Sequence, residues 1–211
     1  IVVIKQFFGG IGQNFANPAI AARIILLISF GQAMGNWTAP LSWKTDAVST
    51  ATPLAILGGE TAEELPSLLD MLLGNRGGAI GETCAVALLI GCVYLLARKI
   101  ITFETPVVYI ATVFLLTLAF KQDLTVALYH TLGGGLLIGA IFMATDYVTT
   151  PVNRLGKVVF ALGCGVITVL IRLFGSYPEG VSFAILIMNI VTPYLEKIGS
   201  PKPFGGVKNE N

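Results

Sequence analysis

Residues 157–174 read KVVFALGCGVITVLIRLF, an apolar stretch whose only charged side chains, Lys157 and Arg172, lie near its two ends. A helix needs ~17 to 25 mostly apolar residues to cross the hydrocarbon core of a bilayer, and this stretch is long enough. At that depth no water bonds to the backbone, so its N–H and C=O groups must bond to one another, as they do in a helix. The stretch predicts a membrane-spanning helix.

The rest of the 211-residue chain has the same character. It is 55% hydrophobic and 12% charged, its mean hydropathy is +0.80, and its apolar residues fall in long blocks. This composition is too apolar for an ordinary soluble domain. The formal net charge is +1 and the basic residues form small groups at the ends of the blocks, so we expect no surface that binds nucleic acid. The composition predicts an integral membrane protein in contact with membrane lipid.

Six blocks are candidate membrane spans. We predict an all-α integral membrane protein, a polytopic helical bundle that forms a single membrane domain over residues 1–211. Gly31-x-x-x-Gly35 and Gly135-x-x-x-Gly139 predict close approaches of helix backbones, and the glycines from Gly133 would give the fourth span a smooth packing surface. The predicted spans cover residues 18–34, 81–97, 104–120, 124–143, 157–174 and 180–195.

The lysines and arginines of the predicted loops fall mostly on one side of the membrane. By the positive-inside rule this side is cytoplasmic, and the bias places the C-terminus there. The segment at residues 35–80, between the first two spans, then lies on the outer face. Within it, the apolar spacing of residues 66–73 predicts a short helix along the membrane interface. Because the chain begins with Ile1, we expect it to be the C-terminal part of a longer subunit.

The outer segment contains DAVSTATP at residues 46–53. This sequence resembles the Asp-x-x-Ser/Thr-x-Ala-Thr motif at which bacterial proteins carry FMN as a phosphoester on the last threonine. The small side chains of Ser49, Thr50 and Ala51 leave access to the hydroxyl of Thr52. The motif predicts a covalent flavin site on Thr52 within an outer, flavin-bearing loop.

Two roles are open for this sequence. In an attachment site, Asp46 would bond to nearby backbone amides or help to place a metal ion during modification. Pro53 would hold Thr52 in an extended conformation, with its hydroxyl directed away from a helix. In the other role, Asp46 and Ser49 cap a helix that starts near Pro53, because proline is favoured at the first helical position.

Segments along most of the chain resemble one family. From Gly9 to Glu196 the sequence is similar to the D subunit of the Rnf electron-transport complex and, more distantly, to the B subunit of the sodium-pumping NADH:quinone oxidoreductase. The longest matching segment runs from Ile171 to Asn189. The others are GGIGQNFANPA at 9–19, DAVSTATPLA at 46–55, Gly74-Asn75 with Gly81-Glu82, and FMATDYVT at 142–149.

The resemblance implies a subunit of the bacterial cytoplasmic (inner) membrane that carries FMN on Thr52, attached by a flavin transferase. Such a subunit works with the other subunits of an Rnf complex, which passes electrons between ferredoxin and NAD and moves Na+ or H+. The resemblance also implies further spans before Ile1. Finally, it implies riboflavin held non-covalently by Asn14 and Asn17, whose amides can both donate and accept. The alternative is that these asparagines cap the turn before Pro18.

Acidic residues near the spans are candidates for ion coupling, because charge within a membrane is costly and is kept mainly for function. We select Glu82, Glu179 and Asp146, and we expect the first two to lie at span ends where water reaches them. Asp146 belongs to TDYVTTP at residues 145–151, which echoes TDAVSTATP at residues 45–53. The echo would lie on the opposite face, an arrangement found in the inverted repeats of transporters.

Other polar residues within apolar blocks have two interpretations each. His130 could relay protons or pack while bonded to a neighbour. Arg23 and Arg172 could pair with carboxylates or with a flavin carbonyl, or extend to the interface.

The sequence shows no nucleophile, nucleotide-binding or metal-ligand pattern, so we expect an electron-transfer subunit of a translocase and no self-contained enzyme. The rival function is a small-solute channel or transporter without flavin, and a third is a purely structural membrane scaffold.

Overall fold

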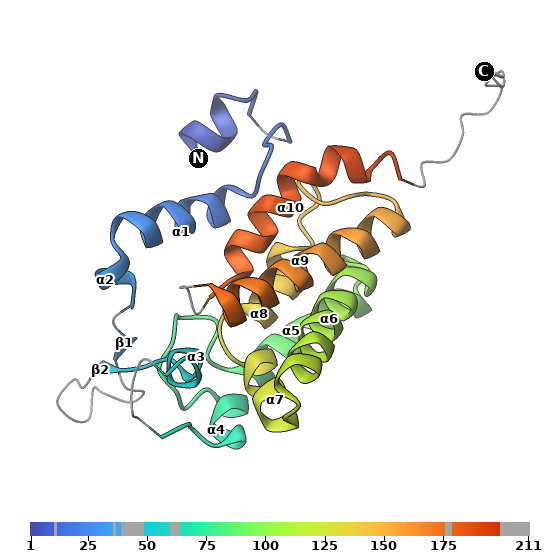
Figure 1. Cartoon of the computed structure of the whole chain (residues 1–211). Helices are drawn as coiled ribbons and strands as arrows, with labels where there is room; N and C mark the ends of the chain where they lie inside the picture. Colours follow the sequence, from blue (N-terminus) through green and yellow to red (C-terminus); the bar gives the residue numbers. More distant parts are fainter. Residues whose placement is uncertain (11, 36, 39–48, 60–63, 176–178, 199–211) are drawn as a thin grey trace, which may run out of the picture.

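The computed structural model describes residues 1–10, 12–35, 37–38, 49–59, 64–175 and 179–198. Nearly all regular structure in these residues is helical, as predicted (Figure 1). The first elements are η1 (Val2–Gln6), α1 (Pro18–Ser29), α2 (Gly31–Gly35), β1 (Trp37–Thr38), β2 (Ser49–Thr50), α3 (Pro53–Leu57), α4 (Leu68–Leu73) and α5 (Ala85–Ala97). The others are α6 (Glu104–Lys121), α7 (Leu124–Leu132), α8 (Leu136–Ile138), η3 (Gly139–Met143), α9 (Arg154–Phe174) and α10 (Val181–Leu195).

The closest helix pair is α6 and α9, which run parallel, since Glu104 pairs with Arg154 where the two helices begin and Phe120 contacts Phe174 where they end. The buried hydroxyls of Tyr109 on α6 and Thr168 on α9 share a hydrogen bond of 2.7 Å. Nearby, a Cβ at Gly165 would lie 2.6 Å from the Cβ of Thr112, so glycine is what allows this approach. Small residues and buried polar pairs hold helices together in a bilayer, where apolar contact alone gives no preference for another helix over lipid.

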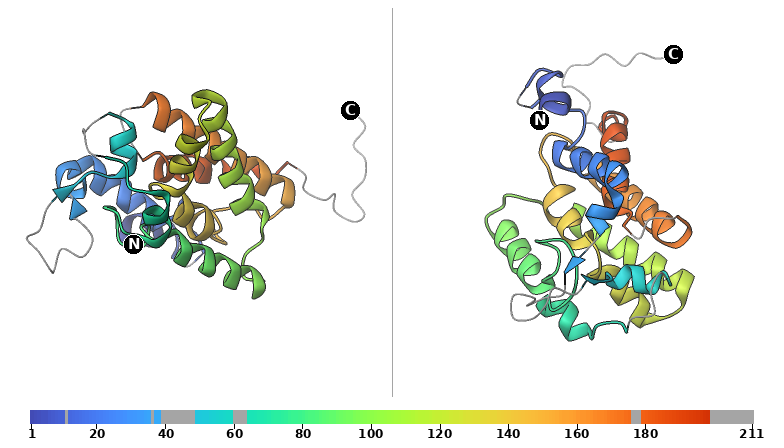
Figure 2. Two further views of the ribbon diagram at one scale, coloured as in Figure 1. Left: turned by 90° about the horizontal axis from the view of Figure 1, so that it is seen from below. Right: turned by 90° about the vertical axis from the view of Figure 1, so that its left-hand side faces the viewer.

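The helices α10 and α1 extend this pair to one side (Figures 1 and 2). α10 packs against α9, and α1 packs against α10. Their shared core is apolar and includes Ile20, Phe160 and Ile185, each fully buried. Large apolar side chains on the outer faces, such as Leu115 and Ile190, are exposed. Helices that are apolar all round are typical of a membrane bundle whose outer face contacts lipid.

The prediction of six spans is confirmed only in part. In the described residues, α6 and α9 are long and apolar enough to cross a membrane, and a third span follows if the bent pair Leu124–Leu132 and Leu136–Met143 counts as one. The other three blocks form the shorter apolar helices α1, α5 and α10. The first block is interrupted at Phe30 (φ −132°), and the second starts late because the chain first turns at Gly81 (φ +94°).

The fourth predicted span is broken at residues 133–135, and its two halves meet at 59°. These glycines therefore form no smooth packing surface. Gly134 has φ +62°, a left-handed conformation that is costly for residues with a Cβ. A Cβ at Gly134 would also lie 2.6 Å from Cδ1 of Leu54 on α3. The glycines end α7, turn the chain and let α3 approach the break.

Of the two predicted glycine contact motifs, the later one makes a close helix contact. A Cβ at Gly139 would collide with Cγ1 of Val181 on α10, so glycine is required there. A Cβ at Gly31 or Gly35 would meet no described atom within 4 Å. The earlier motif therefore makes no close contact in the described part of the chain.

The segment at residues 35–80 contains short elements of its own. β1 and β2 form an antiparallel ladder of two residues each, which departs from the all-helical prediction. α4 confirms the short helix predicted there, and the hydroxyl of Ser67 caps it. Both α3 and α4 contact α7, so these two helices lie at one end of the bundle (Figure 1).

Candidate functional site

Thr52 is the N-cap residue of α3. Its backbone is extended (φ −73°, ψ 150°), and its Oγ accepts a hydrogen bond of 3.3 Å from the N–H of Ala55. The extended conformation predicted from Pro53 is confirmed, but the hydroxyl caps the helix instead of pointing away from it. The cap is therefore Thr52 and not Ser49, and Asp46 lies outside the described residues.

Residues 50 and 51, just before Thr52, pack against Gly77 in the connection between α4 and α5. A Cβ at Gly77 would collide with Oγ of Thr50 and would lie 3.6 Å from the carbonyl oxygen of Ala51. The Thr50 Oγ is buried and has no hydrogen-bond partner in the described residues. A Cβ at Gly78 would lie 3.2 Å from Oε1 of Glu82. Residues 50 and 51 and Glu82 therefore lie against two adjacent glycines of the same connection.

Glu82 is 4% exposed and shares an arginine with a second glutamate. Its Oε1 accepts a hydrogen bond of 3.1 Å from the N–H of Ala79, and its Oε2 lies 3.8 Å from a guanidinium nitrogen of Arg23. The same nitrogen donates to Oε2 of Glu179. Of the interpretations considered for Arg23, pairing with carboxylates is the one present in the structure. The expectation that water reaches Glu82 is wrong, because the turn before α5 folds inward.

Two further arginines hold the carbonyl end of α7. Arg172 of α9 donates to the carbonyls of His130 and Gly133, the second at 3.3 Å. Arg76 is buried and donates to the carbonyl of Leu132 at 2.9 Å. The last carbonyls of a helix lack partners within the helix and carry partial negative charge, which favours cations. The arginines therefore stabilise the C-terminal end of α7.

Glu82 lies at the other end of the break, where α8 begins. A Cβ at Gly135, the N-cap residue of α8, would lie 3.4 Å from Oε2 of Glu82. The first N–H groups of a helical segment carry partial positive charge, which favours an anion. The two ends of the break thus face polar side chains, with Arg76 and Arg172 at the C-terminal end of α7 and Glu82 near the start of α8.

Buried polar atoms without hydrogen-bond partners gather around the break. In the described residues these atoms are Oγ of Thr50, Oε2 of Glu82, Nδ1 of His130, Nε of Arg172 and, elsewhere, Oε2 of Glu104. Buried polar groups are nearly always bonded to protein, water or ligand. This part of the molecule is therefore the best suited to bind a polar group. We use the term break site for Thr50, Thr52, Arg76, Glu82, Gly133, Gly134, Gly135 and Arg172.

Glu82 should make stability depend on pH. Burial, and then the Glu179 carboxylate, raise the pKa of Glu82 to about 7. The N–H of Ala79 and the guanidinium groups of Arg23 and Arg76 act in the opposite direction. Between the ordinary carboxyl pKa of 4.5 and about 7, the folded protein holds a proton that the unfolded chain has lost. Raising the pH through this window therefore destabilises the fold.

We expect Glu82→Gln to abolish this dependence, because glutamine imitates the protonated carboxyl. The wild type should lose about 3 kcal/mol relative to the variant between pH 4.5 and 7, at ~1.4 kcal/mol per pKa unit, and then level off. Thermal unfolding midpoints of both proteins in the same detergent, measured across this range, test the prediction. Parallel curves would contradict it.

Asn14 and Asn17 make local hydrogen bonds before and within the first turn of α1. Oδ1 of Asn17 accepts from the N–H of Ala19 at 3.0 Å, and Nδ2 of Asn14 donates to the carbonyl of Ala16 at 3.3 Å. The capping role considered for these residues is therefore present at Asn17. Whether either amide also meets a flavin stays a prediction.

The turn that carries Asp146 lies beside Asn17 and not at the break site. Asp146 accepts a hydrogen bond of 3.0 Å from the hydroxyl of Thr149. Asn189 of α10, with its amide oriented to satisfy both neighbours, donates to the carbonyl of Thr149 at 3.1 Å and accepts from the N–H of Asn17 at 3.2 Å. The structure brings Glu82 and Glu179 together and leaves Asp146 apart from them.

One family accounts for almost the whole chain, because its sequence profile matches residues 1–205. The chain belongs to the NQR2, RnfD, RnfE family. It is 46% identical over 211 residues to the D subunit of the Na(+)-translocating ferredoxin:NAD(+) oxidoreductase complex of Acetobacterium woodii. It is 44% identical over 217 residues to the D subunit of the proton-translocating ferredoxin:NAD(+) oxidoreductase complex of Clostridium ljungdahlii. The D subunit of the ion-translocating oxidoreductase complex of Stutzerimonas stutzeri is 39% identical over 234 residues.

These alignments cover 99%, 97% and 95% of this member of the NQR2, RnfD, RnfE family, in the same order. They cover 64%, 66% and 66% of the three relatives. The chain thus spans just under two thirds of the length of these relatives. The family inferred from the sequence segments is confirmed.

Sequence reasoning missed part of the break site in this NQR2, RnfD, RnfE family chain. The sequence by itself indicates no role at this site for Arg76, Gly77 or Gly78. The available signal was an arginine followed by two glycines, since paired glycines allow backbones to approach closely. The inward fold of this loop could not be read from hydropathy, because the loop is polar.

Proposed function

We propose that this chain is part of an electron-carrying membrane subunit of an ion-translocating ferredoxin:NAD+ oxidoreductase, and that it carries FMN covalently on Thr52. Two relatives are named as subunits of such complexes, one translocating Na+ and the other protons. The observation that carries the flavin assignment is the position of Thr52. It is the last residue of the Asp-x-x-Ser-x-Ala-Thr pattern, and it lies on α3, which packs on the break.

The geometry at Thr52 is compatible with a phosphoester. The side chain is half-buried, and among the described residues its oxygen accepts a hydrogen bond from the N–H of Ala55. Esterification replaces only the hydroxyl proton, which donates to no partner in the described residues. The ester oxygen keeps a lone pair for the Ala55 N–H, so the cap survives attachment. FMN on Thr52 would not require α3 to unfold.

The break site offers polar atoms that suit a flavin. Leu54, two residues after Thr52, packs on Gly133 and Gly134, and Arg172 bonds to the same backbone. The buried Nε–H of Arg172 can donate to a carbonyl or phosphate oxygen, and the Thr50 hydroxyl can donate or accept. When bound, FMN supplies one- and two-electron transfer. The residues of this chain bind it, orient it and keep water away.

The proposal includes riboflavin bound without a covalent link near Asn14 and Asn17. Oδ1 of Asn17 is used to cap α1, so its NH2 group and Oδ1 of Asn14 are the amide atoms that would meet the edge of the ring. Ion coupling is proposed at Glu82 and Glu179, which share Arg23, and separately at Asp146. The other Rnf subunits are the proposed partners, a flavin transferase the modifying enzyme and the bacterial inner membrane the location.

The rival function, a small-solute channel or transporter, is favoured by one observation, the broken α7–α8 helix. Transporters use the free carbonyls of such breaks to coordinate cations. In this chain Arg172 and Arg76 bond to those carbonyls at the end of α7. The protein supplies its own cations there, which argues against an ion-coordinating transporter site and for a fixed polar scaffold.

The decisive experiment is flavin detection on the denatured protein. The full-length subunit, expressed with its flavin transferase, should fluoresce under ultraviolet light in a denaturing gel. The peptide that contains Thr52 should carry the mass of FMN minus water. A channel, a transporter or a structural scaffold predicts no fluorescent band, and an unmodified peptide from fully processed protein would reject the proposal.

A further inference from the structure

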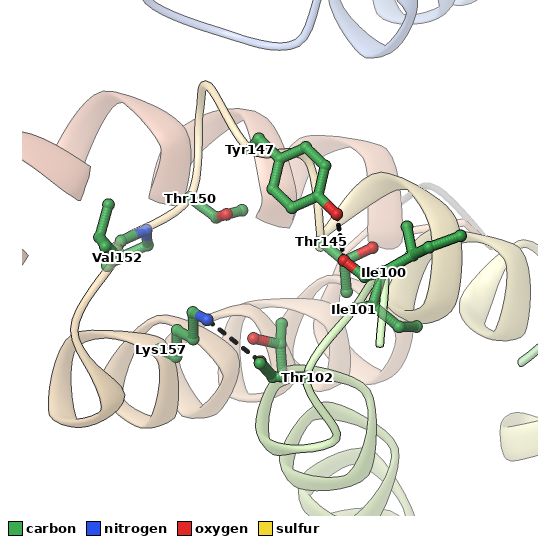
Figure 3. Close-up of a pocket in the computed structure, with 10 residues that line it drawn as sticks. Ile100, Ile101, Thr102, Thr145, Tyr147, Thr150, Val152 and Lys157 are labelled. Atoms are coloured by element: carbon green, nitrogen blue, oxygen red, sulfur yellow. Dashed lines mark hydrogen bonds between the residues drawn. The ribbon is translucent and has the colours of Figure 1, made fainter. Parts of the chain in front are cut away.

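A pocket of about 260 Å³ lies at the opposite end of α5 from the break site (Figure 3). It is enclosed by the connection from α5 to α6, by the turn after η3 and by the first turn of α9. Tyr147 and Lys157 lie on opposite sides of it, and Ile100, Ile101 and Val152 border the space between them. At ~30 Å³ per water molecule it has room for about nine water-sized groups, the size of a lipid headgroup.

The pocket is held open by hydrogen bonds between its own walls. The hydroxyl of Tyr147 donates to the carbonyl of Ile100. This bond joins the turn after η3 to the connection from α5 to α6. The hydroxyls of Thr145 and Thr150 donate to backbone carbonyls in their own turn, at 2.7 and 2.6 Å. Because these hydroxyls are engaged, the walls present mainly methyl and methylene groups. A ligand would meet apolar walls and one cation, Lys157.

Lys157 is available to an anion. Its ammonium group donates to the hydroxyl of Thr102 at 3.1 Å, and it takes part in none of the ion pairs of the described residues. The nearby carboxylate of Glu104 forms its ion pair with Arg154, at 3.2 Å, and the charge of Lys157 acts on it without a direct ion pair. Arg98 and Lys99, immediately before Ile100, are exposed and add positive charge next to the pocket. Cations therefore outnumber carboxylates at this end of the bundle.

The pocket also lies at the ends of the two long apolar helices, where the headgroups of a bilayer are expected. α6 and α9, the two helices long enough to span, both begin beside it, at Glu104 and Arg154. Basic pockets between membrane helices bind acidic headgroups. We propose that this pocket binds the phosphate headgroup of an acidic phospholipid, with Lys157 as the counter-ion of the phosphate and the apolar walls against the glycerol and the first methylenes of the chains.

The test uses the full-length protein in discs of equal parts phosphatidylglycerol and phosphatidylcholine, followed by native mass spectrometry of the lipid retained in mild detergent. The wild type should retain phosphatidylglycerol over phosphatidylcholine by about fivefold, the size expected for one lysine. Lys157→Gln should reduce this preference to near one. Lys121→Gln, at the other end of α6, is the matched control and should leave it unchanged. Val152→Trp, which fills the pocket and keeps the charge, should also remove the preference.

Three outcomes would overturn the proposal. The first is an unchanged preference in Lys157→Gln, which would place the bound lipid elsewhere. The second is displacement of the lipid by millimolar inorganic phosphate alone, which would show a site for the free ion. The third is a wild type with no preference for the acidic lipid, as expected if a protein segment covers the pocket. The test does not depend on flavin attachment, so its result is separate from that of the proposed function.

Discussion

Replacement of Thr52 by valine is expected to remove all covalently bound flavin from the denatured subunit. The phosphoester needs a hydroxyl at this position, and valine has nearly the same shape without the oxygen. The change also deletes the cap of α3, which costs about 1 kcal/mol. This loss is small beside the packing of the bundle, so the subunit should still reach the membrane. The measurement is in-gel fluorescence, normalised to the amount of subunit in the membrane fraction.

Two matched variants separate chemistry from structure. Thr52→Ser keeps both the hydroxyl and the cap, so the chemistry remains available and fluorescence should persist. Thr50→Val replaces the buried hydroxyl next to Gly77 and leaves Thr52 intact, so covalent flavin should remain. Full fluorescence in Thr52→Val would place the flavin on another residue, and loss of fluorescence in Thr50→Val would move the acceptor to Thr50.

Replacement of Arg172 by methionine is expected to destabilise the bundle by about 3 kcal/mol. The change leaves the carbonyls of His130 and Gly133 without their donor, and each unsatisfied buried carbonyl costs ~1 to 3 kcal/mol. Removing a buried charge returns part of this cost, which keeps the estimate below the sum of the two. The thermal midpoint should fall by roughly 6 to 12 °C for a chain of this size.

The control for Arg172→Met is Arg154→Met. The side chain of Arg154 is 86% exposed at the other end of α9, and exposed ion pairs contribute little. Its replacement should shift the midpoint by less than about 2 °C. Arg172→Lys should recover part of the stability, because one ammonium group can reach one of the two carbonyls. Equal midpoints for Arg172→Met and Arg154→Met would show that the break does not depend on Arg172.

Hydropathy predicted where helices form better than how long they are. The blocks that became α6 and α9 are continuous, and these helices match the predicted spans to within a few residues. The block at residues 124–143 is equally apolar but contains three consecutive glycines. Hydropathy treats them as neutral. In the structure, Gly134 adopts a left-handed backbone conformation (φ +62°), which interrupts the helix. The number of spans was therefore the weakest part of the fold prediction.

The candidate site was predicted unevenly for a similar reason. Thr52 followed from a local pattern, and Glu82 and Glu179 from the cost of charge near membrane segments. Their shared partner, Arg23, could not be distinguished by sequence from the other arginines as the residue that pairs with these glutamates. It lies far from both glutamates in the chain, and only the packing of α1 beside α10 brings it to Glu179. No spacing rule connects three residues from three separate segments.

The amino-acid sequence by itself determined that this is a helical membrane protein of the NQR2, RnfD, RnfE family, with one hydroxyl, that of Thr52, as the proposed flavin acceptor. Composition and local patterns are sufficient for this, because burial in lipid forces apolar helices and an acceptor motif is read within a few residues. Only the tertiary structure decided that Thr52 caps α3, that α3 packs on the glycines of a broken helix, and that Arg172 and Glu82 face its two ends. The physical reason is that these contacts join segments far apart in the sequence, and only the packing of the helices brings them together.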